Sequence, residues 1–127
     1  MRHHGLKLVL AGTFAVLLAG APWVQARESA PTEPTVSVAE LPSQGVEVYR
    51  RIHQGGPFAY EKDGVVFGNR ERLLPVHRRG YYREYTVPTP QARDRGARRI
   101  VCGGAPKTPD ACYYTADHYA SFRRIVP

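Results

Sequence analysis

Glu84 and Arg99 stand in two segments that have the composition of β-strands, and alternation decides which face each side chain takes. In the segment 81–87 (YYREYTV), Glu84 points to the same face as the residues two positions before and after it. If that segment pairs antiparallel with 98–102 (RRIVC), Glu84 and Arg99 meet on one surface. A carboxylate beside a guanidinium is either a catalytic pair or an ordinary cross-strand ion pair, and these two residues leave both interpretations open.

His118 is the other side chain suited to acid–base chemistry. It stands in the segment 113–122 (YYTADHYASF). Imidazole transfers protons near neutral pH, but a histidine at the end of a strand is often no more than a surface residue. His53 and His77 are interpreted as surface residues.

The elements that must position these groups follow from the spacing of apolar and turn residues. Val48 and Ile52, four apart, predict a helix over 45–54 with Ser43 as its N-cap, and Gly55-Gly56-Pro57 ends it. The predicted strands are 65–67, 81–87, 98–102, 113–115 and 119–125. One helix before a run of strands predicts a small α+β domain, with the N-terminal helix packed on one face of a twisted antiparallel β-sheet.

The first 26 residues have the layout of a secretory signal peptide. Two cations, Arg2 and Lys7, precede an apolar run over 8–18, and small residues end the segment at Ala26. The apolar run is short for a membrane span. Residues 27–40 are predicted to be a flexible leader and 41–127 the folded domain, so we expect a secreted, extracellular protein.

The charge of the predicted mature chain indicates an anionic partner. Residues 1–26 hold two of the 18 Lys+Arg residues and none of the 11 Asp+Glu residues, which leaves a net charge of +5. Arginine supplies 14 of the remaining 16 cations. Its planar fork grips phosphate through two hydrogen bonds, although a basic surface can also reflect background composition.

Cys102 and Cys112 are the only cysteines. In an exported protein such a pair is expected to be bridged, and a bridge here would staple one local turn. Zinc is not expected, since two thiols ten residues apart without a nearby histidine pair do not match its ligand spacing.

Four linked blocks carry a resemblance to a known family. They are DGVVFGNRERLLP at 63–75, YYREYTVPTP at 81–90, ARDRGARRIV at 92–101 and YYTADHYASF at 113–122. In this order and spacing they resemble the bacterial guanyl-specific ribonucleases, the family that includes barnase and the small Streptomyces ribonucleases. The likeness runs from about residue 41 to residue 125. It implies the microbial ribonuclease fold and an endoribonuclease that cleaves single-stranded RNA after guanine through a 2′,3′-cyclic phosphate.

The resemblance also implies roles for single residues. Glu84 matches the general base and His118 the general acid of the family. Arg95 and Arg99 match its phosphate-binding arginines, and Tyr119 matches a tyrosine that contacts the phosphate. A carboxylate and an imidazole supply the two proton transfers that internal attack by a 2′-hydroxyl needs, so no metal or other cofactor is expected.

The segment Phe67, Gly68, Asn69, Arg70 and Glu71 matches the guanine-binding loop. The resemblance implies that the Glu71 carboxylate accepts from the N1 and N2 donors of guanine, while backbone amides near Asn69 and Arg70 reach O6. Gly68 stands where relatives often have a polar residue. Reading the Watson–Crick edge requires an unpaired base, which favours single-stranded RNA.

Two further expectations concern partners. The resemblance implies that a small acidic inhibitor protein similar to barstar can exist, and the basic face suits an acidic binder. We expect a monomer. The alternative function is a non-catalytic RNA- or polyanion-binding protein of the same fold, which would have no need for both Glu84 and His118.

Overall fold

The computed structural model describes residues 12, 13, 15, 19, 20 and 33–127. The chain divides into two units, Met1–Ala30 and Pro31–Pro127, and the fold given below is that of the second. The predicted signal peptide and the leader up to residue 32 therefore lie almost wholly outside the described residues. Among the residues that are described, no helix is long and apolar enough to cross a membrane.

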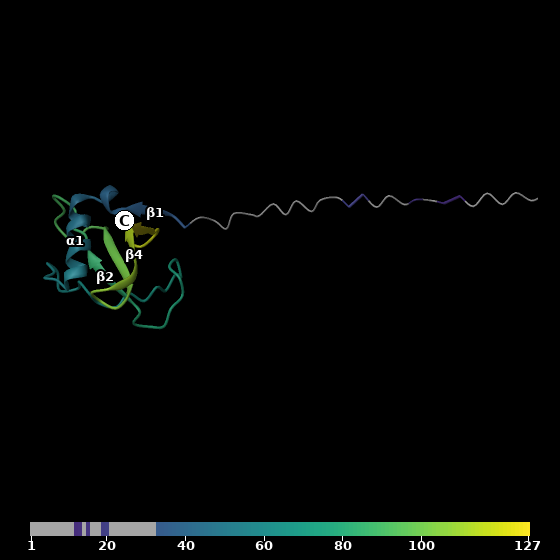
Figure 1. Ribbon diagram of the computed structural model, residues 1–127. Coiled ribbons are helices and arrows are strands. Elements are labelled where there is room, and N and C mark those ends of the chain that lie inside the picture. Colours follow the sequence, from purple (N-terminus) through teal and green to yellow (C-terminus); the bar gives the residue numbers. More distant parts are fainter. Residues whose placement is uncertain (1–11, 14, 16–18, 21–32) are drawn as a thin grey trace, which may run out of the picture. The chain divides into compact units, whose positions relative to one another are not determined.

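The described elements form a mixed five-stranded sheet with one α-helix on it (Figure 1). The strand order is β1-β5-β4-β3-β2, and only the β1–β5 pair is parallel. The α+β prediction is confirmed, whereas the expectation of a wholly antiparallel sheet is wrong at this edge. The elements are β1 (Thr35–Ser37), the 3-10 helix η1 (Val38–Glu40), α1 (Ser43–Gln54), β2 (Tyr82–Thr86), β3 (Arg99–Gly104), β4 (Pro109–Thr115) and β5 (Arg123–Val126).

The folded domain begins earlier than the predicted boundary at residue 41. Val36 of β1 pairs with Ile125 of β5, and both side chains are buried. Arg124 also donates its backbone N–H to the Pro34 carbonyl over 2.8 Å. The end of the supposed leader is therefore a sheet edge, because its apolar residue joins the core.

Helix α1 begins at Ser43, which is its first residue and not its N-cap. Pro42 takes the cap position in an extended conformation, and its carbonyl accepts from the N–H groups of Gly45 and Val46. The helix ends at Gly55, whose φ of 83° is in the left-handed region that glycine adopts without a steric penalty.

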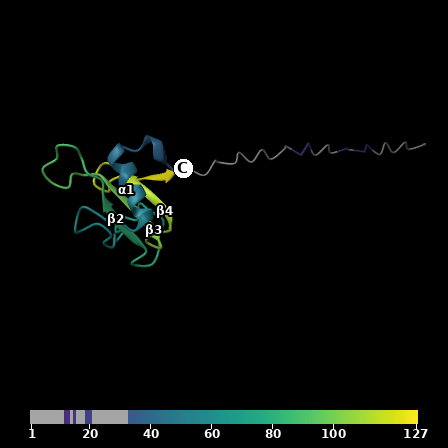
Figure 2. The same cartoon turned by 60° about the vertical axis from the view of Figure 1, so that its left-hand side comes forward.

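The sheet carries a core on each face. α1 lies across one face of the sheet (Figure 2). The larger core is on this face, and in it Ile52 packs with Tyr85, Val87 and Ile100. On the other face a smaller cluster includes Leu74, Tyr82, Val101 and Tyr113, with aromatic side chains around it. The face away from the helix is therefore partly covered, and it also carries Glu84.

Two of the predicted strands are shorter or absent. Residues 65–67 form no strand; Val66 makes one isolated bridge to Arg83, after which the chain leaves the sheet edge. The last strand starts at Arg123 rather than near residue 119. His118 and Tyr119 lie instead in a turn, with φ of 54° and 70°.

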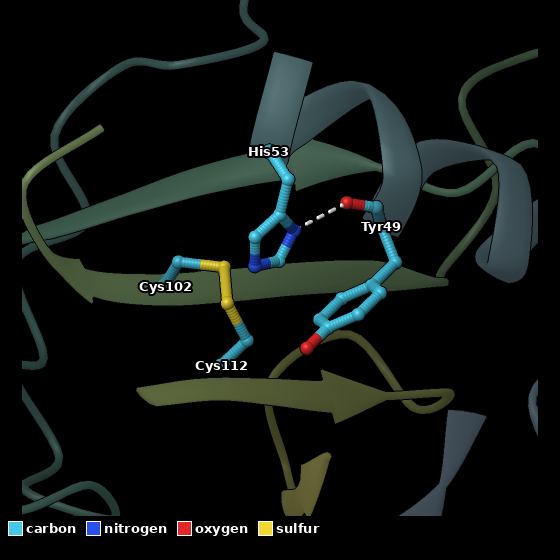
Figure 3. The surroundings of a disulfide bond; sticks show 4 residues. All are labelled: Tyr49, His53, Cys102 and Cys112. Carbon is cyan, nitrogen blue, oxygen red and sulfur yellow. Dashed lines mark hydrogen bonds between the residues drawn. A yellow bond between two sulfur atoms is a disulfide. The ribbon is translucent and has the colours of Figure 1, made fainter. Parts of the chain in front are cut away.

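The predicted disulfide between Cys102 and Cys112 is present. The two residues face each other in the β3–β4 pair, so the bridge closes a β-hairpin and not an isolated loop. Figure 3 shows it beside Tyr49 and His53 of α1, where the His53 Nδ1 atom lies 2.9 Å from the Tyr49 carbonyl. The bridge thus belongs to the larger core.

Removing this bridge is expected to lower the free energy of unfolding by about 2–3 kcal/mol, the loop-closure entropy of a ring of this size. The change is Cys102→Ala with Cys112→Ala, and the measurement is urea unfolding. Reduced unsubstituted protein is the matched control because its sulfur atoms still fill the core. If the reduced protein is as stable as the oxidised one, the cross-link does not stabilise the fold.

Tyr82 predicts how stability depends on pH in the alkaline range. Burial raises the pKa of Tyr82 from 10.0 to about 12, with smaller electrostatic contributions from Tyr113, Tyr81 and Glu33. Between these two values the unfolded chain releases a proton that the folded chain keeps, so stability falls as the pH rises. We expect the free energy of unfolding to fall less steeply over this interval in Tyr82→Phe. An equally steep fall in both proteins would contradict the assignment.

Candidate active site

β2 presents Glu84 on the sheet face opposite α1. The segment 64–65 of the same chain holds the Glu84 backbone in place. The Glu84 N–H donates to the Val65 carbonyl over 2.9 Å, and the Glu84 carbonyl accepts from the Gly64 N–H over 2.7 Å. Its carboxylate is also held at both oxygens. The Tyr119 hydroxyl donates to Oε2 over 2.8 Å, and Arg95 Nη2 donates to Oε1 over 3.3 Å. This carboxylate is therefore fixed in place on the sheet.

Arg95 comes from the loop between β2 and β3, which swings out from the sheet in Figure 2 (green). Its Nε and Nη2 donate to the Thr86 hydroxyl over 3.0 and 2.8 Å. The guanidinium is held on the strand that carries Glu84, and its side chain is a quarter exposed. It can therefore meet an anion arriving from solvent.

Arg99 lies on the same face but does not pair with Glu84. It is 3% exposed, and its Nη1 donates to the carbonyls of Arg95, Gly96 and Arg98. In the described part of the chain its Nε has no hydrogen-bond partner. Carbonyl dipoles leave its charge uncancelled, so a buried cation maintains a positive field on the sheet face that carries Glu84.

The turn that carries His118 is built by Asp117. Its carboxylate accepts from the hydroxyls of Thr115 and Ser121 and from the Ser121 N–H. These hydrogen bonds favour the charged form and lower the pKa of Asp117. They hold His118 and Tyr119 in a left-handed conformation that costs energy for residues other than glycine.

His118 is exposed, and its backbone N–H donates to the Ala97 carbonyl over 3.0 Å. Its turn is thereby tied to the loop that supplies Arg95. The His118 ring meets the Tyr119 ring edge to face, with centroids 4.9 Å apart. Burial, followed by the hydrogen bond to Glu84, raises the pKa of Tyr119, so its hydroxyl stays protonated and keeps donating.

A pocket of about 400 Å³ opens beside these groups. Its walls include the five residues of the predicted guanine loop, together with His118 and Tyr119. The Phe67 ring stacks on that of Tyr119 with centroids 5.1 Å apart. The structure therefore brings the predicted guanine loop, His118 and Tyr119 to one cavity, whereas Glu84, Arg95 and Arg99 are not among its lining residues.

Asn69 fixes the shape of the loop. Its side-chain amide donates to the Leu74 carbonyl over 3.0 Å and accepts from the Leu74 N–H over 3.2 Å. Its own carbonyl accepts from Arg72 N–H, and its φ is 47°. The side chain thus closes the loop on itself, which leaves backbone groups free to line the pocket.

Sequence reasoning missed several residues of this site. Thr86 anchors Arg95, and its place on the Glu84 face was a signal for it. Thr115 and Asp117 build the turn that carries His118. The signal for this turn was the four-residue spacing of Asp117 and Ser121, whose side chains form a hydrogen bond. Leu73, Ala120 and Phe122 complete the pocket wall, and no pattern in the sequence singles them out.

A carboxylate held by an arginine and a tyrosine, next to a cavity that a histidine lines and that is large enough for a base, forms a site suited to binding a nucleotide and moving a proton. The family comparison agrees: a profile described as ribonuclease matches residues 24–126. The chain belongs to this ribonuclease family.

Its relatives include guanyl-specific ribonucleases. Sa3 of Kitasatospora aureofaciens is 57% identical over 90 residues, which are 71% of this chain but only 62% of that protein's length. St of Saccharopolyspora erythraea and Sa of K. aureofaciens are each 50% identical over 91 residues, or 72% of this chain. The match covers 86% of St and 92% of Sa.

Solved structures of ribonuclease Sa2 share the fold. The structure of its complexes with mononucleotides aligns with a TM-score of 0.70 and 45% identity, over 77% of this chain and 98% of the other. Sa2 with guanosine-2′-cyclophosphate aligns with a TM-score of 0.68 at 45% identity, over 75% and 97%. The chain thus has the microbial ribonuclease fold that its sequence predicts.

Proposed function

We propose that this protein is a secreted endoribonuclease that cleaves single-stranded RNA on the 3′ side of guanine. The observation that carries the proposal is the position of the Glu84 carboxylate. Tyr119 and Arg95 hold it in place, and Tyr119 also lines the pocket formed by the predicted guanine loop. Relatives with at least half of their aligned residues identical are named guanyl-specific ribonucleases.

In the first step Glu84 takes the proton from the ribose 2′-hydroxyl, whose oxygen attacks the phosphorus. The bond from phosphorus to the 5′-oxygen of the next nucleotide breaks, and His118 gives that oxygen a proton. The product is a 2′,3′-cyclic phosphate. In its hydrolysis His118 accepts a proton from water and Glu84 returns one to the 2′-oxygen. Each group contributes roughly 10²–10⁴-fold to the rate.

Arg95 and Arg99 stabilise the charge that develops on the non-bridging phosphate oxygens. Both are held before substrate arrives, Arg95 by Thr86 and Arg99 by carbonyl oxygens. Fixed cations need no reorganisation when the charge forms. Tyr119 donates its hydroxyl to the Glu84 carboxylate and also lines the pocket, so we assign it a contact with both the base and the phosphate.

Guanine is bound in the 400 Å³ pocket. Its Watson–Crick edge alone presents two adjacent N–H donors, which the acceptor-only carboxylate of Glu71 selects. Glu71 and the segment from Phe67 to Arg70 all line the cavity. Gly68 also lines the cavity and adds its backbone N–H as a further donor.

The proposal is tested by incubating the protein from residue 27 onward with GpC, ApC, UpC and CpC in EDTA. We expect GpC alone to be cleaved rapidly, giving guanosine 2′,3′-cyclic phosphate. Cleavage of all four would keep the acid–base pair but contradict the role of Glu71. No cleavage by folded, disulfide-bonded protein would favour the alternative, a non-catalytic polyanion-binding protein.

Export and inhibition belong to the same proposal. The signal-peptide pattern of residues 1–26 and the disulfide support an extracellular location, because such bridges persist in oxidising compartments. An acidic inhibitor protein similar to barstar would fit the same face, where its carboxylates would replace phosphates against Arg95 and its neighbours.

A further inference from the structure

A second hollow, of about 570 Å³, adjoins the guanine pocket. Residues 67–70 line both cavities, so this segment is a wall common to the two. The rest of the second lining comes from Val66, Arg72, Val76–Gly80 and Tyr82. The stretch of chain from residue 66 to residue 80 contains most of this lining, and it forms the teal loop that projects from the sheet in Figure 1. We call this cavity the basic hollow.

Four arginines line the basic hollow: Arg70, Arg72, Arg78 and Arg79. All four are exposed, and no carboxylate is among the lining residues. Within residues 33–127 none of the four makes an ion pair or a side-chain hydrogen bond, unlike Arg95 and Arg99. Four unpaired guanidinium groups around one recess repel one another, and a polyanion that enters it relieves that repulsion.

The segment that presents Arg78 and Arg79 is anchored at both ends. The His77 ring stacks on the Tyr81 ring with centroids 3.8 Å apart, and Tyr81 N–H donates to the Arg78 carbonyl. Before it, the Pro75 carbonyl accepts from the Tyr82 hydroxyl. The two arginines therefore project from a held turn, which lowers the entropy lost when a ligand orders them.

We propose that the basic hollow binds the phosphates of the RNA chain on the 5′ side of the recognised guanosine. This inference rests on the proposed function of the guanine pocket. One wall of that pocket is the segment 118–122, where the scissile phosphate meets His118. The 3′- and 5′-oxygens leave a ribose in opposite directions, so the 5′ chain runs toward the other wall, which is the one shared with the basic hollow.

The shape of the site favours RNA over a lipid surface. Val66 and Val76 are exposed at its edge, 46% and 71%, and such residues beside arginines could also contact an anionic membrane. The charges, however, surround a recess that opens next to a base-binding cavity, and a flat membrane cannot enter a recess. A flexible phosphate chain held by its guanine can do so.

The test compares two substrates with the variant Arg78→Gln/Arg79→Gln. One substrate is GpC, which has no phosphate on the 5′ side. The other is an oligonucleotide with its only guanine preceded by several uridines. We expect the unsubstituted protein to cleave the longer substrate with a kcat/KM about tenfold higher than GpC, and the variant to lose this advantage through KM. GpC cleavage should change by less than about twofold.

The matched control is Lys62→Gln/Lys107→Gln, which removes two exposed charges from other loops. It should keep the advantage of the longer substrate. An equal loss in both variants would overturn the proposal, because net charge and not the basic hollow would then explain it.

Binding gives a readout independent of cleavage. An oligodeoxynucleotide with one dG lacks the 2′-hydroxyl and stays intact, and its affinity is measured against salt concentration. The arginine variant should reduce the salt slope by about 1.4, since each phosphate contact on a single strand contributes about 0.7. The proposal would be overturned in favour of a membrane site if the arginine variant kept the salt slope of the unsubstituted protein and instead bound phosphatidylserine vesicles more weakly. If the unsubstituted protein fails to cleave GpC, the proposed function fails, and the slope still decides whether the basic hollow binds nucleic acid.

Discussion

Glu84→Gln is expected to lower kcat/KM on GpC by about 10²–10⁴-fold. Glutamine keeps the shape of the side chain, and its carbonyl can still accept from the Tyr119 hydroxyl, which lies 2.8 Å from the Glu84 carboxylate. It cannot take a proton from the 2′-hydroxyl near neutral pH. The loss should therefore fall on kcat, while the affinity for guanosine 3′-monophosphate stays close to that of the unsubstituted protein because the guanine pocket is intact.

A matched control separates this effect from a general loss of charge. Glu61 is an exposed glutamate that lines neither the guanine pocket nor the basic hollow, and Glu61→Gln should retain full activity. Circular dichroism verifies that both variants are folded. The decisive comparison is between the kcat/KM values of the Glu84→Gln variant and of the parent on GpC. Activity of this variant within tenfold of the parent would exclude Glu84 as the general base.

The sequence predicted the elements whose signal is local. Alternation in 81–87 assigned Glu84 to one face, and the observed register places it opposite Val101 with Arg99 opposite Thr86. The two charged residues do share a face, as predicted. Their pairing does not follow from alternation, because Arg95 reaches Glu84 from a loop whose path no periodic pattern describes.

The missed features depend on contacts between distant parts of the chain. β1 is three residues long and pairs in parallel with β5 at the other end of the domain, so neither segment indicates the other. The turn at His118 depends on hydrogen bonds to Asp117 that overcome the strain of two positive φ angles. Local propensity favoured a strand there, since Tyr119 and Phe122 are typical strand residues.

The same distinction applies to the guanine loop. The family resemblance predicted its five residues, and all five line one pocket. It did not predict that the Asn69 side chain closes the loop through Leu74, a contact within six residues that composition alone does not indicate. Because these hydrogen bonds hold the loop around Glu71, a substitution of Glu71 should change guanine recognition without changing the shape of the loop.

Glu71→Gln is expected to lower kcat/KM on GpC by about 10²-fold and to raise the relative cleavage of ApC. The carboxylate accepts from both N1–H and N2–H of guanine, and charged hydrogen bonds of this kind contribute about 1.5–3 kcal/mol each. The glutamine amide offers one acceptor and one donor, so its N–H group opposes a guanine donor. The same amide can donate to N1 of adenine, which is an acceptor and which a carboxylate cannot pair with.

The fold should not change in this variant, because Glu71 is exposed and its side chain makes no hydrogen bond or ion pair within residues 33–127. The measurement is the ratio of kcat/KM for GpC to that for ApC, with Glu61→Gln as the control that should keep the parent ratio. Inosine in place of guanosine lacks the N2 donor, so IpC should be a poorer substrate than GpC for the parent and at least as good a substrate as GpC for the variant, whose amide N–H no longer opposes a donor. An unchanged ratio in Glu71→Gln would exclude Glu71 as the determinant of guanine recognition and assign it to the other polar groups of 68–70, which line the same wall of the pocket.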